Sequence, residues 1–144
     1  ATTEIYTLSL HDALPISGAV VNRGMTTTKK TADVVTTAGA ENLTINRMRD
    51  GIYDRDPNGG ARTDTTDTAA DIVGNPGFAA AIGDTLTFYI VNVADAAEVL
   101  TIAGGTGVTV KGDATIAQNE SRVGVLRMDN VTASSEACTL YLVG

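Results

Sequence analysis

The sequence predicts a mainly β protein: an antiparallel β-sandwich or jelly-roll-like barrel with one short helix near residues 67–73. Three observations support this fold class. Residues 85–93 alternate as a strand does, further short strands recur at intervals of about 8–12 residues, and no predicted helix is long enough to carry a βαβ crossover. We therefore expect antiparallel strands in two packed layers and consider a parallel sheet unfavourable.

The stretch TLTFYIVNV at residues 85–93 is the most strand-like part of the chain. β-branched and aromatic residues fill nearly every position, as a half-buried pleated surface prefers. Residues 137–143 repeat the same alternation, and Tyr89 and Val143 fall on the opposite face of their strands. The positions expected to face the core are apolar in both stretches: Leu86, Phe88 and Ile90 in the first, and Cys138, Leu140 and Leu142 in the last.

Four more strands are expected between these two, at residues 98–103, 107–111, 114–117 and 122–128. Short segments rich in Gly, Asp, Asn or Ser separate them, as turns between strands require. The sequence GGTG at residues 104–107 is interpreted as one such turn, because neither the helix nor the Lys of a phosphate-binding loop follows it.

The first half of the chain is divided by composition. Residues 18–53 are expected to form an arm and first strands, with β-like pieces at 34–37 and 43–45 and a helical turn near 47–53 that Gly51 interrupts. Residues 54–66 are expected to be an Asp/Gly-rich loop, and residues 67–144 the β-sandwich domain. Thr66 or Asp67 is the expected N-cap of the helix, which Asn75-Pro76-Gly77 ends.

Residues 1–17 are interpreted as an artefact. The opening ATTEIYTLSLHDALPIS matches the translation of one reading frame of a widely used sequencing-library adapter, over sixteen consecutive residues. We therefore exclude this segment from functional reasoning. The only histidine, His11, lies in it, so the remaining chain offers no histidine for catalysis or metal binding.

Composition excludes several classes of function. The net charge of −7 argues against a nucleic-acid partner, because there is no basic surface to meet phosphates. No apolar run is long enough to cross a membrane. Aromatic residues make up only 4% of the chain, which predicts a thin core and a marginal domain that gains stability by self-association.

One metal site is a candidate. Asp54-Arg55-Asp56-Pro57-Asn58-Gly59 spells the start of a Ca²⁺-binding loop, with oxygen ligands at alternate positions and a glycine for the sharp turn. The pattern then fails, since Thr65 stands where the bidentate Glu belongs. A solvated Asx/Gly turn without a cofactor is the favoured interpretation, and Asp54, Asp56 and Asn58 are the candidate Ca²⁺ ligands.

No catalytic constellation is predicted, and the protein is not expected to be an enzyme. Cys138, the only cysteine, lies on an inward face and is expected to be a buried, inert thiol. Serines without a histidine cannot form the usual nucleophile–base pair. Asp64 and Asp67 are expected to serve surface solubility.

The chain from residue 54 to 144 resembles a domain common in virion proteins of tailed bacteriophages, especially those from environmental (metagenomic) DNA. The stretches that carry the likeness are DPNGGARTDTTDTAADIV (56–73), IGDTLTFYIVN (82–92), LTIAGGTGVTVKGDATIAQNESR (100–122) and NVTASSEACTLYLVG (130–144). The resemblance implies a viral structural protein located in the virion, as a capsid decoration protein or the base domain of a head or tail fibre. It supplies no functional residues.

The implied partners are copies of the chain itself and phage capsid or tail proteins. A homotrimer is expected for a decoration protein, because threefold capsid sites are met by threefold symmetric oligomers. The polar arm at residues 18–31 would reach the shell by strand addition. The alternative interpretation is a receptor- or glycan-binding fibre or adhesin domain, with Ca²⁺ dependence as a possibility left open by the Asp/Asn/Gly loop.

Overall fold

The computed structural model describes residues 20–22, 25–27 and 29–144, with side chains from residue 29 onward. The adapter-like residues 1–17 lie outside this range, as do the side chains of nearly all of the predicted arm at 18–31. Within the arm, β1 (Val20–Asn22) pairs antiparallel with β2 (Met25–Thr27) in a two-stranded ladder of its own.

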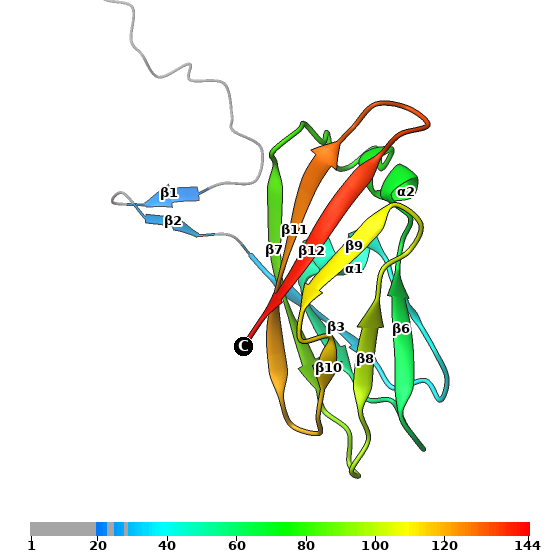
Figure 1. Ribbon diagram of the computed structural model, residues 1–144. Coiled ribbons are helices and arrows are strands. Elements are labelled where there is room, and N and C mark those ends of the chain that lie inside the picture. Colours follow the sequence, from blue (N-terminus) through cyan, green and yellow to red (C-terminus); the bar gives the residue numbers. More distant parts are fainter. Residues whose placement is uncertain (1–19, 23–24, 28) are drawn as a thin grey trace, which may run out of the picture.

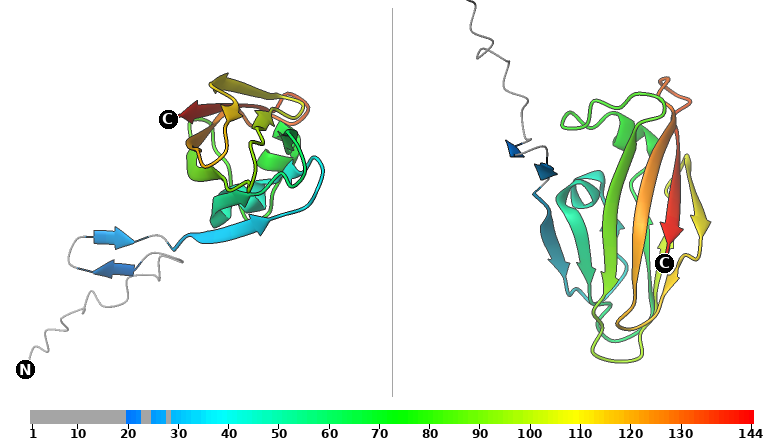
Figure 2. Two further views of the ribbon diagram at one scale, coloured as in Figure 1. Left: turned by 90° about the horizontal axis from the view of Figure 1, so that it is seen from below. Right: turned by 90° about the vertical axis from the view of Figure 1, so that its left-hand side faces the viewer.

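Two sheets make up the body of the molecule (Figures 1 and 2). The larger sheet has the order β3-β5-β7-β11-β12-β9, and the smaller one has the order β10-β8-β6-β4. The strands of the larger sheet are β3 (Thr31–Val35), β5 (Gly51–Arg55), β7 (Thr85–Asn92), β11 (Ser121–Asn130), β12 (Ala137–Val143) and β9 (Val108–Gly112). Those of the smaller sheet are β10 (Thr115–Ile116), β8 (Leu100–Ala103), β6 (Arg62–Thr66) and β4 (Asn42–Leu43). The predicted mainly β, sandwich-like fold with a short helix is confirmed.

The direction of strand pairing differs from the expected antiparallel pattern. β7, β11 and β12 pair antiparallel, but five strand pairs are parallel: β3–β5, β5–β7, β9–β12, β4–β6 and β6–β8. Each parallel pair is joined by a connection that passes through a strand of the opposite sheet. A strand in the second layer therefore replaces the long helix that a parallel crossover usually needs.

The core lies between the two sheets. The larger sheet contributes Phe88 and Ile90 from β7 and Leu140 and Leu142 from β12, as their alternation predicts. The smaller sheet contributes residues such as Leu100, which is fully buried. The side chains that the sequence placed on the inward faces of β7 and β12 share one face of one sheet, because Leu86 of β7 and Leu140 of β12 both lie in register with Leu126 of β11, the strand between them.

Helix α1 (Ile45–Asp50) packs on the inner side of β3, β5 and β7. Its N-cap is Thr44, whose hydroxyl accepts a hydrogen bond from the Arg47 amide at 3.3 Å. Ile45 and Met48 are buried, and the helix ends at Gly51, which has a φ of 100°. Glycine adopts that left-handed conformation without penalty, which explains why the helical pattern stops there.

Helix α2 (Ala69–Val73) is the helix predicted near residues 67–73. Its N-cap is Thr68 and not the predicted Thr66 or Asp67. The Thr68 side chain accepts a hydrogen bond from the Asp71 amide at 3.1 Å. Thr66 is an inward-facing residue of β6, and the Asp67 carboxylate is engaged at the start of α1.

The predicted division of the chain needs two corrections. Residues 54–66 were expected to be a loop, but they include the last two residues of β5 and all of β6, which leaves only 56–61 between strands. The sequence predicts that the strands within 31–55 lie outside the sandwich domain, as part of an arm and first strands. They belong instead to the same two sheets as the later strands. Hydrophobic alternation is weak in β6 because its buried positions are Asp64 and Thr66.

Candidate functional site

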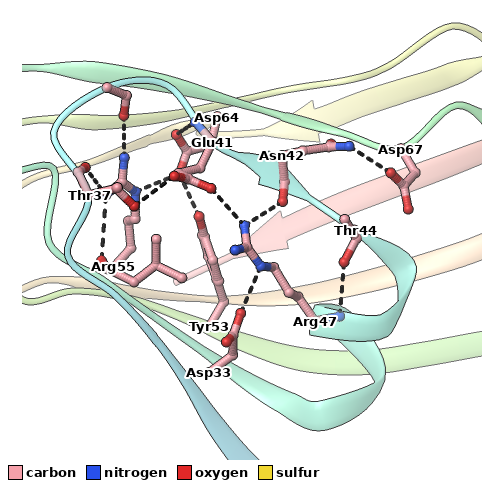
Figure 3. A network of polar contacts seen from close by, with 12 residues as sticks. Asp33, Thr37, Glu41, Asn42, Thr44, Arg47, Tyr53, Arg55, Asp64 and Asp67 are labelled. Carbon is pink, nitrogen blue, oxygen red and sulfur yellow. Dashed lines mark hydrogen bonds and ion pairs between the residues drawn. The ribbon is translucent and has the colours of Figure 1, made fainter.

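A buried ion pair lies near one end of the sandwich (Figure 3). Arg55 and Asp64 are both fully buried, and the Arg55 Nε lies 2.9 Å from Asp64 Oδ2. The Tyr53 hydroxyl donates to the same oxygen at 2.7 Å, and the Glu41 amide donates to Asp64 Oδ1 at 2.8 Å. Burial raises the pKa of Tyr53, and its hydrogen bond to the Asp64 carboxylate raises it further. Tyr53 therefore stays a neutral donor.

The rest of the Arg55 guanidinium binds backbone carbonyls. Its Nη1 donates to the Thr37 carbonyl at 2.8 Å and to the Asp56 carbonyl at 2.6 Å, and its Nη2 donates to the Gly39 carbonyl. These carbonyls belong to the segment after β3 and to the first residue after β5. Arg55 thus holds two connecting segments against the sheet, which is a structural use of a buried charge. The prediction that Asp64 serves surface solubility is wrong.

Arg47 on α1 extends this network toward the surface (Figure 3). Its Nε pairs with Asp33 Oδ2 at 2.8 Å, and its Nη1 pairs with Glu41 Oε2 at 3.2 Å. The Thr37 hydroxyl donates to Glu41 Oε1 at 2.6 Å. The hydrogen bonds from Thr37 and Arg47 lower the pKa of Glu41. The arrangement keeps the segment between β3 and β4 in one position.

Asp67 joins β6 to the start of α1. Its Oδ2 accepts from the Ile45 amide at 2.8 Å, and its Oδ1 accepts from Asn42 Nδ2 at 2.8 Å. A carboxylate at this end of a helix satisfies an amide that has no partner within the helix. Asp67 is therefore also a structural residue, and not only the solubilising one that the sequence suggested.

The structure does not bring the predicted Ca²⁺ ligands together as a loop of the expected type. Asp54 lies on the outer face of β5, in register between Val34 and Val91, and its Oδ1 is buried without a hydrogen-bond partner among the described residues. Asp56 and Asn58 form an Asx turn, in which Asp56 Oδ1 accepts from the Asn58 amide at 2.9 Å. The Asn58 side chain donates to the Thr36 carbonyl at 3.0 Å.

Asp56 instead meets two acids from the loop between β7 and β8. One carboxylate oxygen from each of Asp56, Asp95 and Glu98 lies within 4.8 Å of the others. Asp95 and Glu98 are about forty residues away along the chain, so no local motif could have pointed to this cluster. The signal in the sequence was limited to Asp56 and the turn residues around it.

The outer face of the larger sheet carries a row of apolar side chains. Five residues lie in register across five strands: Ala32, Ile52, Tyr89, Val123 and Val143. Tyr89 is 43% exposed and Val143 is 59% exposed. The right-hand view of Figure 2 shows these strands side by side. We call this set of five residues the outer row. The alternation of the sequence predicted only two of its members, Tyr89 and Val143, on the outward faces of β7 and β12.

Neighbouring positions widen the outer row. Val34 is adjacent to it on β3 and is 62% exposed, and Val125 and Tyr141 lie in register on its other side. Two lysines lie over the tyrosines: Lys30 Nζ is 5.9 Å from the Tyr89 ring centroid, and Lys111 Nζ is 5.7 Å from that of Tyr141. The face therefore combines apolar area with positive charge on an acidic protein.

Three smaller predictions can be compared with the structure. Cys138 is a buried free thiol, as expected, and burial raises its pKa to about 11. Residues 104–107 form the predicted turn between β8 and β9, and the Gly105 amide donates to Thr66 Oγ1 at 2.9 Å. Among the helices from residue 29 onward, none has the length and apolar character needed to span a membrane.

Comparisons with known proteins give no relative for this chain. No protein-family model, no curated protein and no solved structure matches it. A function is therefore inferred from the geometry described above and from the sequence resemblance.

Proposed function

We propose that the chain is a non-catalytic structural module of a tailed-phage particle, a capsid decoration protein or fibre-base domain that works by association through the outer row. Copies of the chain itself, as a homotrimer, and phage capsid or tail proteins are the proposed partners. The sequence resemblance supplies the phage context. The outer row is the structural observation that supports an associating role.

An exposed apolar row of this kind favours contact with another protein surface. Isolated exposed apolar residues are ordinary, but contiguous patches mark interaction sites. The outer row runs across five adjacent strands, so its members form a continuous strip and not scattered positions. Each Å² of apolar surface removed from water contributes roughly 25 cal/mol, so covering such a strip would stabilise a complex.

The tyrosine and lysine side chains on and beside the outer row fit an interface that is anchored by aromatic residues. Tyrosine is enriched at interfaces because it has a large apolar ring and a polar end. Lys30 holds its place beside Tyr89 by donating from Nζ to the Thr87 carbonyl at 2.8 Å. The lysine stems would add apolar contact area while their charges face an acidic partner surface.

A rigid body suits such a role, and the buried network provides it. Arg55 links β5 to carbonyls in the segment after β3, and Asp64 links β6 to Glu41 before β4. Both sheets and two connections are therefore held together by one ion pair. A surface fixed in this way loses little conformational freedom when it binds.

The experiment that tests the proposal is the mass of the full chain in solution. Size-exclusion chromatography with light scattering at micromolar concentration is expected to give three times the chain mass of 14.8 kDa. A strictly monomeric species across the concentration range would contradict self-association. The neighbouring genes on the source DNA test the phage context: a major-capsid gene is expected beside a decoration protein, and a tail gene beside a fibre-base domain.

A further inference from the structure

We propose that Asp56, Asp95 and Glu98 bind one divalent cation, Ca²⁺, at the end of the sandwich where the β5–β6 and β7–β8 loops meet. The ligand set differs from the one expected from the sequence, since it retains Asp56 and replaces Asp54 and Asn58 with two residues from a distant loop. The site is separate from the outer row and does not depend on the proposed association.

The first observation is the spacing of the carboxylates. The three oxygens lie within 4.8 Å of one another. Calcium binds oxygen at about 2.3–2.6 Å, so two ligands on opposite sides of one ion are roughly 4.8 Å apart. The three carboxylates therefore lie within the width of one calcium coordination shell.

The second observation is a buried oxygen that lacks a partner. Glu98 is only 7% exposed, and its Oε1 accepts a hydrogen bond from the Gly59 amide at 2.6 Å. Its Oε2 is buried and has no hydrogen-bond partner in the part of the chain that the structure describes. A buried carboxylate oxygen without a donor is costly, and two further carboxylates close by add repulsion. A bound cation resolves both costs.

Both loops are held in place before any ion binds. The Asn92 side chain donates to the Glu98 carbonyl at 2.8 Å and accepts from the Ala94 amide at 3.1 Å, which fixes the β7–β8 loop from inside. The Val93 amide donates to the Arg55 carbonyl at 2.9 Å, directly before Asp56. Site rigidity of this kind favours binding because little ordering remains to be done.

The chemistry of the site favours calcium among the common cations. Carboxylate oxygens are hard ligands that suit Ca²⁺ and Mg²⁺. Asp95 is exposed, so water can complete the six to eight ligands that calcium takes. Mg²⁺ needs near-ideal octahedral geometry and gives up its water reluctantly, whereas Ca²⁺ accepts irregular sets of oxygen ligands, so carboxylates from two separate loops suit Ca²⁺ better.

The test is calcium titration of the full chain, stripped with a chelator, by calorimetry and by thermal unfolding. We expect one Ca²⁺ per chain and, at about 100 times the Kd, a rise in Tm on the order of 10 °C. Glu98→Gln keeps the size of the side chain and the acceptor for the Gly59 amide. It is expected to weaken Ca²⁺ binding at least tenfold and to raise the Tm of the metal-free protein.

Two further variants make the outcome decisive. Asp95→Asn changes an exposed residue whose charge is screened by water, so it should raise the metal-free Tm less than Glu98→Gln does and still weaken Ca²⁺ binding. Glu136→Gln, a glutamate outside the cluster, should bind as the wild type does. The inference is overturned by the absence of both heat and a Tm shift up to about 10 mM Ca²⁺. It is equally overturned if Asp95→Asn and Glu98→Gln bind like the wild type, or if Mg²⁺ binds more tightly than Ca²⁺.

Discussion

Replacing Asp64 with asparagine should destabilise the protein strongly, because it removes the carboxylate that pairs with the buried Arg55. The asparagine side chain would have the same shape, but it has one acceptor oxygen in place of two, and its NH2 group can only donate. The guanidinium would keep its positive charge with no counter-charge at this position, although Asp64 and Arg55 are both fully buried. Breaking a buried ion pair by removing one partner typically costs about 3–5 kcal/mol.

The magnitude can be followed through the contacts. Two donors converge on Asp64 Oδ2, the Arg55 Nε at 2.9 Å and the Tyr53 hydroxyl at 2.7 Å. If the neutral asparagine oxygen takes the Oδ2 position, the charge-assisted part of these hydrogen bonds is lost and the NH2 group faces the Glu41 amide, which is also a donor. In the opposite orientation the NH2 group faces Arg55 and Tyr53, which are donors too. We expect a loss of about 4 kcal/mol, near the middle of that range, and a fall in Tm on the order of 10–15 °C.

The assay is urea unfolding followed by circular dichroism, with Asp50→Asn as the matched control. Asp50 is an exposed residue at the end of α1, and changes at such positions usually alter stability by less than about 0.5 kcal/mol. A loss below about 1 kcal/mol for Asp64→Asn would refute the reasoning, since that is the range of a solvated surface pair.

Three further predictions follow from buried or engaged groups. Gly124→Ala should cost about 1–3 kcal/mol in urea unfolding, because the added methyl would lie 2.5 Å from the Phe88 ring; a variant as stable as the wild type would show that the ring can move. The thiol of Cys138 should resist a disulfide reagent at pH 8 in the folded protein and react fully in denaturant, since burial raises its pKa to about 11; rapid labelling without denaturant would contradict this. The hydrogen bonds of Thr37 and Arg47 lower the pKa of Glu41 below its ordinary value of 4.5, so this stabilisation is present above that pH and is lost as the pH falls through the folded-state pKa. Urea midpoints from pH 7 to 3 should therefore drop less for Glu41→Gln than for the wild type, and an equal drop would remove Glu41 as a contributor.

The sequence predicted the strands with ordinary alternation well. β7 and β12 have apolar residues on one face and mixed residues on the other, and both lie close to their predicted bounds. The turn at 104–107 followed from its glycines. In these segments the local pattern and the tertiary environment agree, so the sequence alone is sufficient.

The sequence failed where buried positions are polar or where partners are distant. β6 faces the core with Asp64 and Thr66, so an interpretation based on hydrophobicity took it for a loop. Parallel pairing went unpredicted because the crossovers run through the opposite sheet. The cluster of Asp56, Asp95 and Glu98 joins two loops that no sequence pattern relates.

The most direct test of the account is the self-association constant of an outer-row variant, measured by sedimentation equilibrium. Tyr89→Lys replaces the central aromatic residue of the outer row. Thr85→Lys introduces a lysine on the same strand, β7, but outside the outer row. The account predicts that Tyr89→Lys weakens association by roughly 30-fold, as the loss of an interface hot spot of about 2 kcal/mol would. Thr85→Lys should associate like the wild type, and equal association of all three proteins would contradict the assignment of this face.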